Sequence, residues 1–412
     1  MAPYGIPGSP EVAAFRRKIE EHIVSVKADG SIHLNQEYFS YSTGLRMIRE
    51  RKWAALFGFP LRPPESDMEQ HHCDLALAIQ EVTEEIVLRM ARTARKLTGC
   101  TRLCLAGGVA LNCVANGRLL RSGIFADIWI QPAAGDAGGA LGAAYAAHHM
   151  YYDQPRLPGE AADAMQGSYL GPEYSELDTV LMLKKFNARG RSYESFDRLC
   201  EDVAGHIADG QVVGWHQGRM EWGPRSLGNR SILGDPRNED MQKKLNLKIK
   251  YRESFRPFAP SVLAEDCQEY FDLGSPSPYM LLVADVQKAQ QNPLPADYYE
   301  QDLKKRLYFL RSGIPSVTHL DYSARVQTVH GDTNPRYHRL IRAFRDRTGC
   351  SLLVNTSFNV RGEPIVCTPE DSYRCFMRTE MDYLVIGNQV FAKTDQPDWD
   401  AKDRWQEEFK LD

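Results

Sequence analysis

The sequence lacks a long, uninterrupted run of apolar residues. Its two most apolar stretches, Leu103 to Leu111 and Ala137 to Ala147, are shorter than the ~20 residues of a membrane-spanning helix, and glycines interrupt both. The first residues also have neither the basic start nor the apolar centre of a signal peptide. We therefore expect a cytoplasmic protein without a membrane segment.

Paired cysteines and a large excess of one charge are also missing. The nine cysteines include no CxxC pair, so neither a disulfide framework nor a zinc ribbon is indicated. The 50 basic and 54 acidic side chains leave a net charge of −4, which indicates no nucleic-acid partner. With 412 residues, the chain exceeds the usual size of one hydrophobic core, and two domains are expected.

The first half of the chain has clear periodicity. Apolar residues recur at helical spacing from Asp74 to Leu97, and Gly99 follows as a C-cap. A strand over 102–106, a helix over 112–121 and a strand near 128–130 should follow. This βαβ-like order predicts a partly parallel sheet.

Prolines and glycines accumulate between residues 151 and 173, where the periodicity stops. Such a segment is typical of a linker, so we expect a first domain over 1–150, a second over 174–395 and a charged, solvated tail over 396–412. The fold class is predicted to be α/β for the first domain and α+β for the second. In the second domain we expect a helix at 196–208 and strands at 211–215, 351–354 and 383–386.

Two glycine-rich segments follow strands in the first domain. Gly107 and Gly108 end a strand and open a helix near Asn112, so backbone N–H groups could face an anion, although a tight structural turn has the same pattern. Asp136 stands before Gly138 at the start of a helix of small residues. This carboxylate is suited either to a divalent metal below a nucleotide phosphate or to capping the helix.

The second domain contains four loops rich in cations or amides. Arg225 lies in a rigid loop over 221–231, and Lys250 and Arg256 lie in a run over 248–260 where cations alternate with aromatic residues and prolines. Arginine binds phosphate bidentately, so these loops favour a small anionic ligand over a solvated surface. The other two loops carry Arg325 in 321–329, and Asn355 and Ser357 in 353–364.

The order of these motifs resembles that of the O-carbamoyltransferase family, which includes nodulation-factor enzymes and enzymes that carbamoylate aminoglycoside, cephem and ansamycin antibiotics. Several long motifs in one order are more specific than any single glycine loop. The resemblance covers nearly the whole chain. It is carried by the segments 2–5, 106–112, 131–139, 222–233, 256–260 and 355–359.

The resemblance implies a partial actin-like, ribonuclease H-like ATPase domain followed by a YrdC-like domain. The YrdC-like domain would combine carbamoyl phosphate with ATP to give carbamoyl adenylate and pyrophosphate. Lys250 and Arg256 match its catalytic positions. The positions that match its substrate-binding site are Arg225, Lys250, Arg256, Arg325, Asn355 and Ser357.

The resemblance also implies that the actin-like domain transfers the carbamoyl group to a hydroxyl of a small-molecule acceptor. Gly107, Gly108, Asn112 and Gly138 match its nucleotide-binding side. Asp136 matches a ligand of a divalent metal, either iron or magnesium. The identity of the acceptor is not readable from these residues.

The sequence departs from the family pattern at its start, where the first actin-like subdomain and its metal-binding histidines would be expected. His71 and His72 precede a helix at the wrong place in the pattern to replace them. We expect a gene fragment, a miscalled start, or one half of a split enzyme completed in trans by an N-terminal half. Self-association as a homo-oligomer is a further expectation. The alternatives are a non-catalytic nucleotide or carbamoyl phosphate binding subunit, and a relative that modifies a protein thiol or tRNA.

Overall fold

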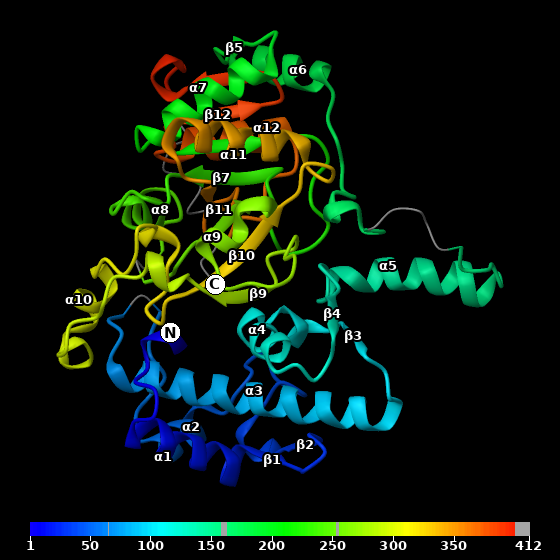
Figure 1. Cartoon of the computed structure of the whole chain (residues 1–412), viewed down its shortest axis with the longest axis vertical. Coiled ribbons are helices and arrows are strands. Elements are labelled where there is room, and N and C mark those ends of the chain that lie inside the picture. The colour runs from blue at the N-terminus through cyan, green and yellow to red at the C-terminus, as the bar shows by residue number, and fades with distance from the viewer. Residues whose placement is uncertain (65, 158–162, 253–254, 400–412) are drawn as a thin grey trace. The chain divides into compact units, whose positions relative to one another are not determined.

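The computed structural model describes residues 1–64, 66–157, 163–252 and 255–399, which form two compact units (Figure 1). The first unit contains Met1–Leu105, Val114–Trp129 and Pro293–Phe309, and the second contains Ala106–Cys113, Ile130–Asn292 and the chain from Leu310. The limits of these units differ from the predicted domains, since Ile130 and the residues after it belong to the second unit and residues 293–309 to the first. The predicted domain limits, which follow the break in periodicity at residues 151–173, stay a prediction.

The long helix α3 (Gln70–Thr98) organises the first unit. It confirms the helix predicted from Asp74 to Leu97 and ends where Gly99 adopts a φ of 68°, a left-handed conformation that favours glycine. The other helices and strands of this unit are α1 (Pro10–Lys18), β1 (Val24–Val26), β2 (Ile32–Leu34), α2 (Glu50–Phe57), β3 (Arg102–Leu105), α4 (Cys113–Arg121), β4 (Asp127–Ile130, ending at the unit boundary) and α10 (Leu303–Tyr308).

Two apolar clusters attach these elements to α3. Val82 lies in the cluster that α3 forms with α1 and α2. Leu88 lies in the cluster that α3 forms with α4, where the side chain of Leu119 is fully buried. An ion pair of 2.6 Å joins Arg118 of α4 to Glu84 of α3 beside this second cluster.

The predicted order of strand, helix and strand after α3 is present as β3, α4 and β4. The two strands pair with each other in a separate two-stranded sheet. They are not part of the large sheet of the second unit, which contains the strands β5 to β13.

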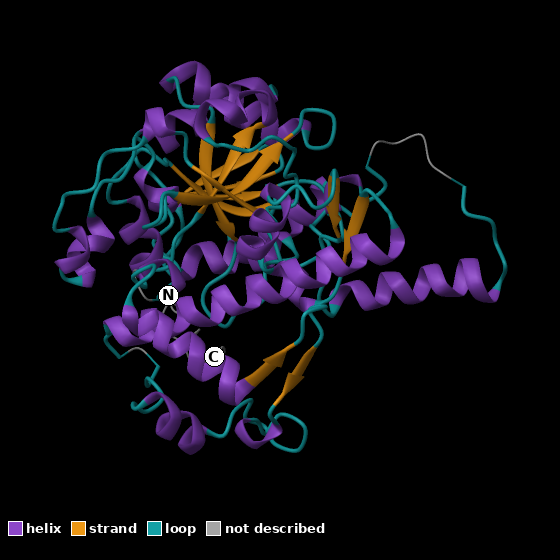
Figure 2. Ribbon diagram, turned by 60° about the horizontal axis from the view of Figure 1, so that its bottom comes forward, coloured by secondary structure: helices purple, strands orange, loops and turns teal. Residues whose placement is uncertain are grey.

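The second unit contains a nine-stranded mixed sheet, seen as orange arrows in Figure 2. Its order is β5-β13-β12-β6-β7-β11-β8-β10-β9, with parallel pairing only between β12 and β6 and between β10 and β8. The strands are β5 (Arg191–Ser192), β6 (Val213–His216), β7 (Arg230–Gly234), β8 (Ala259–Leu263), β9 (Leu282–Asp285), β10 (Ser323–Val329), β11 (Leu352–Ser357), β12 (Tyr383–Ile386) and β13 (Gln389–Ala392).

The helices of the second unit follow the predicted pattern closely where apolar periodicity is strong. The helix α7 has the predicted bounds, and Leu199, Val203 and Ile207 on one of its faces are buried. The helices are α5 (Ala137–Ala146), α6 (Glu176–Phe186), α7 (Phe196–Ala208), α8 (Met241–Lys248), α9 (Cys267–Tyr270), α11 (Pro335–Thr348) and α12 (Pro369–Arg378).

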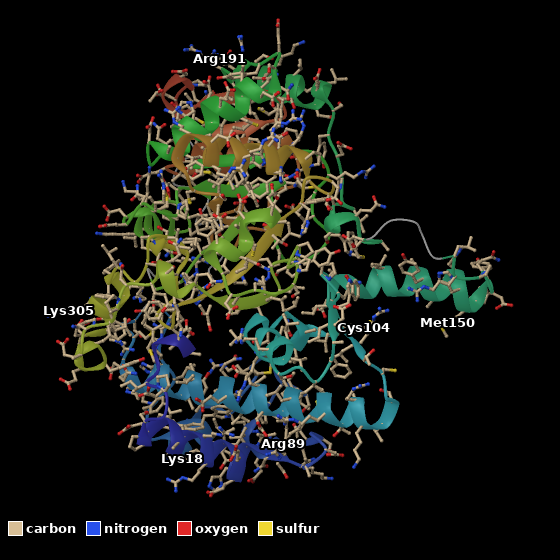
Figure 3. All side chains as sticks on the ribbon, in the orientation of Figure 1. Lys18, Arg89, Cys104, Met150, Arg191 and Lys305 are labelled. Carbon is tan, nitrogen blue, oxygen red and sulfur yellow. The ribbon has the colours of Figure 1, made fainter. Side chains whose placement is uncertain are left out.

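The helix α5 is the predicted helix of small residues, but none of its residues is buried. The exposed side chains continue beyond it to Met150, which Figure 3 labels, and Tyr151. Among the described residues, no helix combines the length and apolar character needed to cross a membrane.

Two segments predicted as linker and tail are partly packed. Ser168, in the predicted linker, is buried and its hydroxyl donates to the carbonyl of Trp222 at 2.5 Å. In the predicted tail, Oε1 of Gln396 accepts a hydrogen bond from the Tyr373 hydroxyl at 3.0 Å, and the Trp399 ring lies near that of Tyr373. Residues 396–399, at the start of the tail predicted to be mostly solvated or frayed, therefore contact the core through an aromatic and an amide side chain. Residues 400–412 of the tail and 158–162 of the linker lie outside the described residues.

We predict that Leu119→Ala lowers the free energy of unfolding by about 2–5 kcal/mol, because it removes a fully buried side chain between α3 and α4. Urea unfolding measures the change. The matched control is Leu97→Ala, since Leu97 is 79% exposed and its loss should change stability by less than about 0.5 kcal/mol. Equal effects of the two substitutions would contradict the described packing.

Candidate functional site

One face of the nine-stranded sheet carries a row of polar side chains. Side chains two residues apart on a strand point to the same face, so Asn355 and Ser357 share a face of β11. Arg325 and Gln327 share a face of β10 for the same reason. Hydrogen bonds join Asn355, Gln327 and Ser261 of β8, so the three strands present this row on a common face. Three predicted substrate-binding residues therefore lie on one surface.

A buried carboxylate shapes the loop between β6 and β7, which carries Arg225. Oε1 of Glu221 accepts hydrogen bonds from the backbone N–H groups of Leu227 at 2.7 Å and Asn229 at 2.8 Å. It accepts a third from the N–H of Arg230 at 3.3 Å. Hydrogen bonds to an ionised acceptor are about twice as strong as neutral ones. Glu221 therefore fixes the backbone from which Arg225 projects.

The two arginines of this loop have different surroundings. The buried guanidinium of Arg230 donates to the backbone carbonyls of Gln217 at 2.8 Å, Asn229 at 3.0 Å and Cys367 at 3.2 Å. By contrast, the buried Nε of Arg225 has no hydrogen-bond partner among the described residues. Arg230 is thus a structural residue, and Arg225 is the arginine of this loop that is available to a ligand.

Charge interactions connect five arginines through Arg325, which acts on both Arg225 and Arg252. Burial and the charge of Arg325 lower the pKa of Arg225 to about 10. Burial also lowers the pKa of Arg252 to about 10, and the nearby charges of Arg256, Arg325 and Arg361 act in the same direction. Because like charges repel, an anion placed among these arginines would offset their mutual repulsion.

Sequence reasoning missed Arg252 and Arg361. Both lie inside segments that were singled out, but a run with several cations does not indicate which of them point inward. The structure shows that Nε of Arg252 donates to Oδ1 of Asn246 at 2.8 Å and that its guanidinium lies 5.1 Å from the centre of the Phe258 ring. These contacts hold the Arg252 side chain in place.

The predicted catalytic residue Lys250 is buried, and burial lowers its pKa to about 7. Its Nζ donates to Oγ of Ser357 at 3.1 Å, to the carbonyl and Oδ1 of Asn359 at 2.8 and 2.7 Å, and to the Ser357 carbonyl. Lys250 therefore attaches the end of β11 to the following loop. Its direct contact with a substrate stays a prediction.

Several buried polar atoms of this region have no hydrogen-bond partner among the described residues, including Oε2 of Glu221 and Nε1 of Trp222, and three more belong to or adjoin the predicted site. These three are Nε of Arg225, Oγ of Ser226 and Oδ1 of Asn355. Asn355 contacts Ser226, since its Nδ2 donates to the Ser226 carbonyl at 3.1 Å, and Arg225 precedes Ser226 in the chain. Buried polar groups are nearly always hydrogen-bonded in folded proteins, so this arrangement indicates a place for a polar ligand.

The predicted nucleotide-binding glycines have different roles. Gly107 has a φ of 91°, which favours glycine, and Gly108 faces open space where a Cβ would meet no atom. A short 3-10 helix, Gly108–Leu111, and Asn112 precede α4, which begins one residue after the predicted start of the helix at 112. A Cβ at Gly138 would lie 2.2 Å from the Ala133 carbonyl oxygen. Any other residue would clash with the backbone there, so packing alone accounts for this glycine.

Asp136 precedes α5, but its side chain makes no capping hydrogen bond, so the capping alternative is wrong. Within the described ranges, no group of three or more His, Cys, Asp or Glu side chains is placed to hold a metal ion. One carboxylate does not fit a metal site. The metal therefore stays a prediction, and no chemical step is assigned to it.

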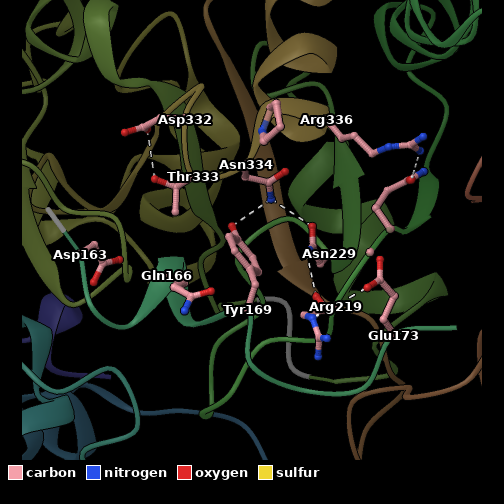
Figure 4. Close-up of a pocket in the computed structure, with 13 residues that line it drawn as sticks. Asp163, Gln166, Tyr169, Glu173, Arg219, Asn229, Asp332, Thr333, Asn334 and Arg336 are labelled. Carbon is pink, nitrogen blue, oxygen red and sulfur yellow. Dashed lines mark hydrogen bonds and ion pairs between the residues drawn. The ribbon is translucent and has the colours of Figure 1, made fainter. Parts of the chain in front are cut away.

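A separate polar pocket of about 680 Å³ lies in the second unit (Figure 4), and none of the predicted site residues lines it. Many of its side chains contact one another: Nδ2 of Asn334 donates to the Tyr169 hydroxyl at 2.9 Å and to Oδ1 of Asn229 at 3.0 Å. Likewise, Arg336 donates to Oε1 of Gln217 at 2.7 Å. These contacts give the side chains a structural role.

Comparison with known families gives two matches. Residues 3–145 match the carbamoyltransferase N-terminus, and residues 204–393 match the carbamoyltransferase C-terminus. The chain belongs to the carbamoyltransferase family. The resemblance expected from its motifs is thus confirmed, and the described part of the second unit contains the arginine loop, the cation-rich run and the β11 segment of the matched C-terminal region.

The chain is similar to an uncharacterized protein, to a nodulation protein and to an O-carbamoyltransferase. An uncharacterized protein of Synechocystis sp. is 56% identical, and the match covers 100% of this chain and 66% of that protein. Nodulation protein NolO of Bradyrhizobium diazoefficiens is 40% identical over 87% of this chain and 62% of its own length. The 3'-hydroxymethylcephem-O-carbamoyltransferase of Streptomyces clavuligerus is 32% identical over 79% of this chain and 55% of its own length.

The chain therefore spans only about half to two thirds of the length of these relatives. A solved structure, full-length HypF in the phosphate- and nucleotide-bound form, matches 50% of this chain and 22% of its own at 15% identity, with a TM-score of 0.27. That likeness is too weak to support a structural argument.

We predict that Glu221→Ala lowers the free energy of unfolding by at least about 3 kcal/mol, because three backbone N–H groups lose a charged acceptor. Glu221→Gln should lower the free energy of unfolding by less, since the amide oxygen of glutamine can still accept hydrogen bonds from these N–H groups. Chemical denaturation measures both. Glu173→Ala is the control, because the Glu173 side chain is more than half exposed. A loss below about 1 kcal/mol for Glu221→Ala would contradict the assigned role.

We also predict a pH effect at Lys250. The folded protein should release the Lys250 proton near pH 7, whereas the unfolded chain keeps it up to about pH 10.4. The unfolded state then binds more protons between these values. Relative to Lys250→Met, the free energy of unfolding of the wild type should therefore rise with pH by up to about 1.4 kcal/mol per pH unit.

Urea unfolding of both proteins at several pH values between about 7 and 10 measures this difference. A difference that stays constant over this range would show that the acceptors around Nζ keep the ammonium charged. Lys248→Met, at a side chain that is 55% exposed, controls for the loss of a lysine on the neighbouring helix α8.

Proposed function

We propose that this chain activates carbamoyl phosphate with ATP, as part of an O-carbamoyltransferase that carbamoylates a hydroxyl of a small-molecule acceptor. The observation that carries the proposal is the arginine cluster beside the polar row of the sheet. The cluster suits phosphoryl groups, and the amide and hydroxyl of Asn355 and Ser357 suit a small planar carbamoyl group.

The proposed activation balances with one water molecule. Water and carbamoyl phosphate give carbamate and inorganic phosphate. A carbamate oxygen then attacks the α-phosphorus of ATP, and the bond to the leaving pyrophosphate breaks, which gives carbamoyl adenylate. Guanidinium groups of Arg225, Arg256 and Arg325 would offset the charge that develops on the phosphoryl oxygens, and Lys250 would hold Ser357 in position.

The finer fold assignment belongs to the same proposal. The nine-stranded sheet with the arginine loops would be the YrdC-like part, and the segments around Gly107, Gly108, Asn112 and Gly138 would belong to an actin-like nucleotide-binding part. Since no described side chains join Asp136 in a metal-binding group, the activation step is proposed without assigning a role to a protein-bound iron or magnesium ion.

Transfer to the acceptor is the second part of the proposal. It is supported by relatives named for O-carbamoylation, of which this chain spans about half. We propose that the remaining part of such a protein, joined or supplied in trans, completes the transfer site. The acceptor is proposed only as a small molecule with a hydroxyl group.

We predict that the purified chain releases pyrophosphate from ATP only when carbamoyl phosphate is present. Arg256→Ala should lower kcat/KM for this release by about 10²-fold or more, because one cation of the phosphate site is lost. A coupled pyrophosphate assay measures the rate. Arg198→Ala is the control of equal charge change, since Arg198 is exposed on α7, and it should leave the rate unchanged.

Folded wild-type protein that binds carbamoyl phosphate without releasing pyrophosphate would support the alternative of a non-catalytic binding subunit. Release that is the same with and without carbamoyl phosphate would contradict the proposed activation.

A further inference from the structure

The orientation of the Asn355 amide is determined by a chain of hydrogen bonds that begins at a backbone carbonyl. The carbonyl of Leu227 can only accept, and it accepts from Nε2 of Gln327 at 2.8 Å. This bond sets the orientation of the Gln327 amide, since the opposite orientation would place two oxygens against each other. Oε1 of Gln327 must therefore face the interior of the polar row.

Oε1 of Gln327 in turn orients its neighbours. It accepts from the hydroxyl of Ser261 at 2.5 Å and from Nδ2 of Asn355 at 3.0 Å. Nδ2 also donates to Oγ of Ser261 at 2.9 Å and to the carbonyl of Ser226 at 3.1 Å. Every acceptor around Asn355 therefore faces its nitrogen.

The consequence is a buried acceptor with no donor. Asn355 is only 1% exposed, and its Oδ1 has no hydrogen-bond partner among the described residues. Such an oxygen binds a ligand that offers an N–H and disfavours one that offers a methyl group. Oδ1 is covered by neighbouring atoms, so a ligand would reach it only after those atoms move.

We propose that Gln327 is a positioning residue that holds Oδ1 of Asn355 toward the donor substrate, so that the site selects a carbamoyl group over an acetyl group. This inference rests on the proposed use of carbamoyl phosphate. A carbamoyl group has an NH₂ where an acetyl group has a CH₃, and the two are otherwise nearly equal in size. The shape of a site would discriminate poorly between the two groups, whereas a buried unpaired acceptor discriminates strongly in favour of the carbamoyl group.

The test is calorimetric titration of the whole chain with carbamoyl phosphate, acetyl phosphate and inorganic phosphate, which needs no turnover. We expect the wild type to bind carbamoyl phosphate about 10²-fold or more tightly than acetyl phosphate. In Gln327→Met, this ratio should fall about tenfold or more, while the affinity for inorganic phosphate, which the arginine cluster determines, stays near the wild-type value.

Two further variants keep the test informative. Ser261→Ala removes one partner of the same network and should lower the ratio in the same direction if Gln327→Met does not fold. Thr328→Val removes a buried hydroxyl from the same strand that bonds the Ser277 N–H, not Asn355, so its ratio should equal that of the wild type.

The outcomes separate this inference from the proposed function. Equal affinities of the wild type for carbamoyl and acetyl phosphate would overturn the role of Gln327 and leave the activation of carbamoyl phosphate standing. An unchanged ratio in Gln327→Met and Ser261→Ala would do the same. Wild-type protein that binds none of the three ligands would overturn both.

Discussion

The candidate site depends on one carboxylate oxygen, Oε1 of Glu221, which accepts hydrogen bonds from three backbone N–H groups of a single loop. One of these donors is Leu227, whose carbonyl accepts from the Tyr169 hydroxyl and from Gln327. Both backbone groups of Leu227 are thereby fixed. These hydrogen bonds hold the short piece of backbone that positions the arginine before Leu227 and the amide network beside it.

The site combines charges that repel with polar groups that lack partners. Buried arginines near one another and an unpaired Asn355 oxygen each disfavour the folded state without a ligand. Surrounding contacts offset these costs, as when Lys250 anchors the end of β11 through four hydrogen bonds and Arg230 donates to backbone carbonyls beneath the loop. Unfavourable electrostatic free energy of this kind is typical of a binding site, where a ligand of opposite charge offsets it.

The two compact units contribute differently to this picture. The first is held by ordinary apolar packing on the long helix α3, as around Leu119, and its predicted elements are recognisable because their periodicity is strong. The second contains the polar row, which is assembled from strands distant in sequence, such as β10 and β11. Family membership links both units to the carbamoyltransferases, and the second unit contains the arginine cluster and the polar row on which the proposed recognition of the donor rests.

Much of the secondary structure and the family could be predicted from the sequence, because both depend on short-range patterns. The periodicity of α3 and α7, the glycine that ends α3 and the order of the arginine-rich motifs are all local properties of the chain. Three features needed the tertiary structure. It separated the structural Arg230 from Arg225, added Arg252 and Arg361 to the cluster, and joined Gln327 to Asn355. Each depends on which side chains from distant strands and loops share one buried face, and that is determined by strand register and loop conformation rather than by residue type.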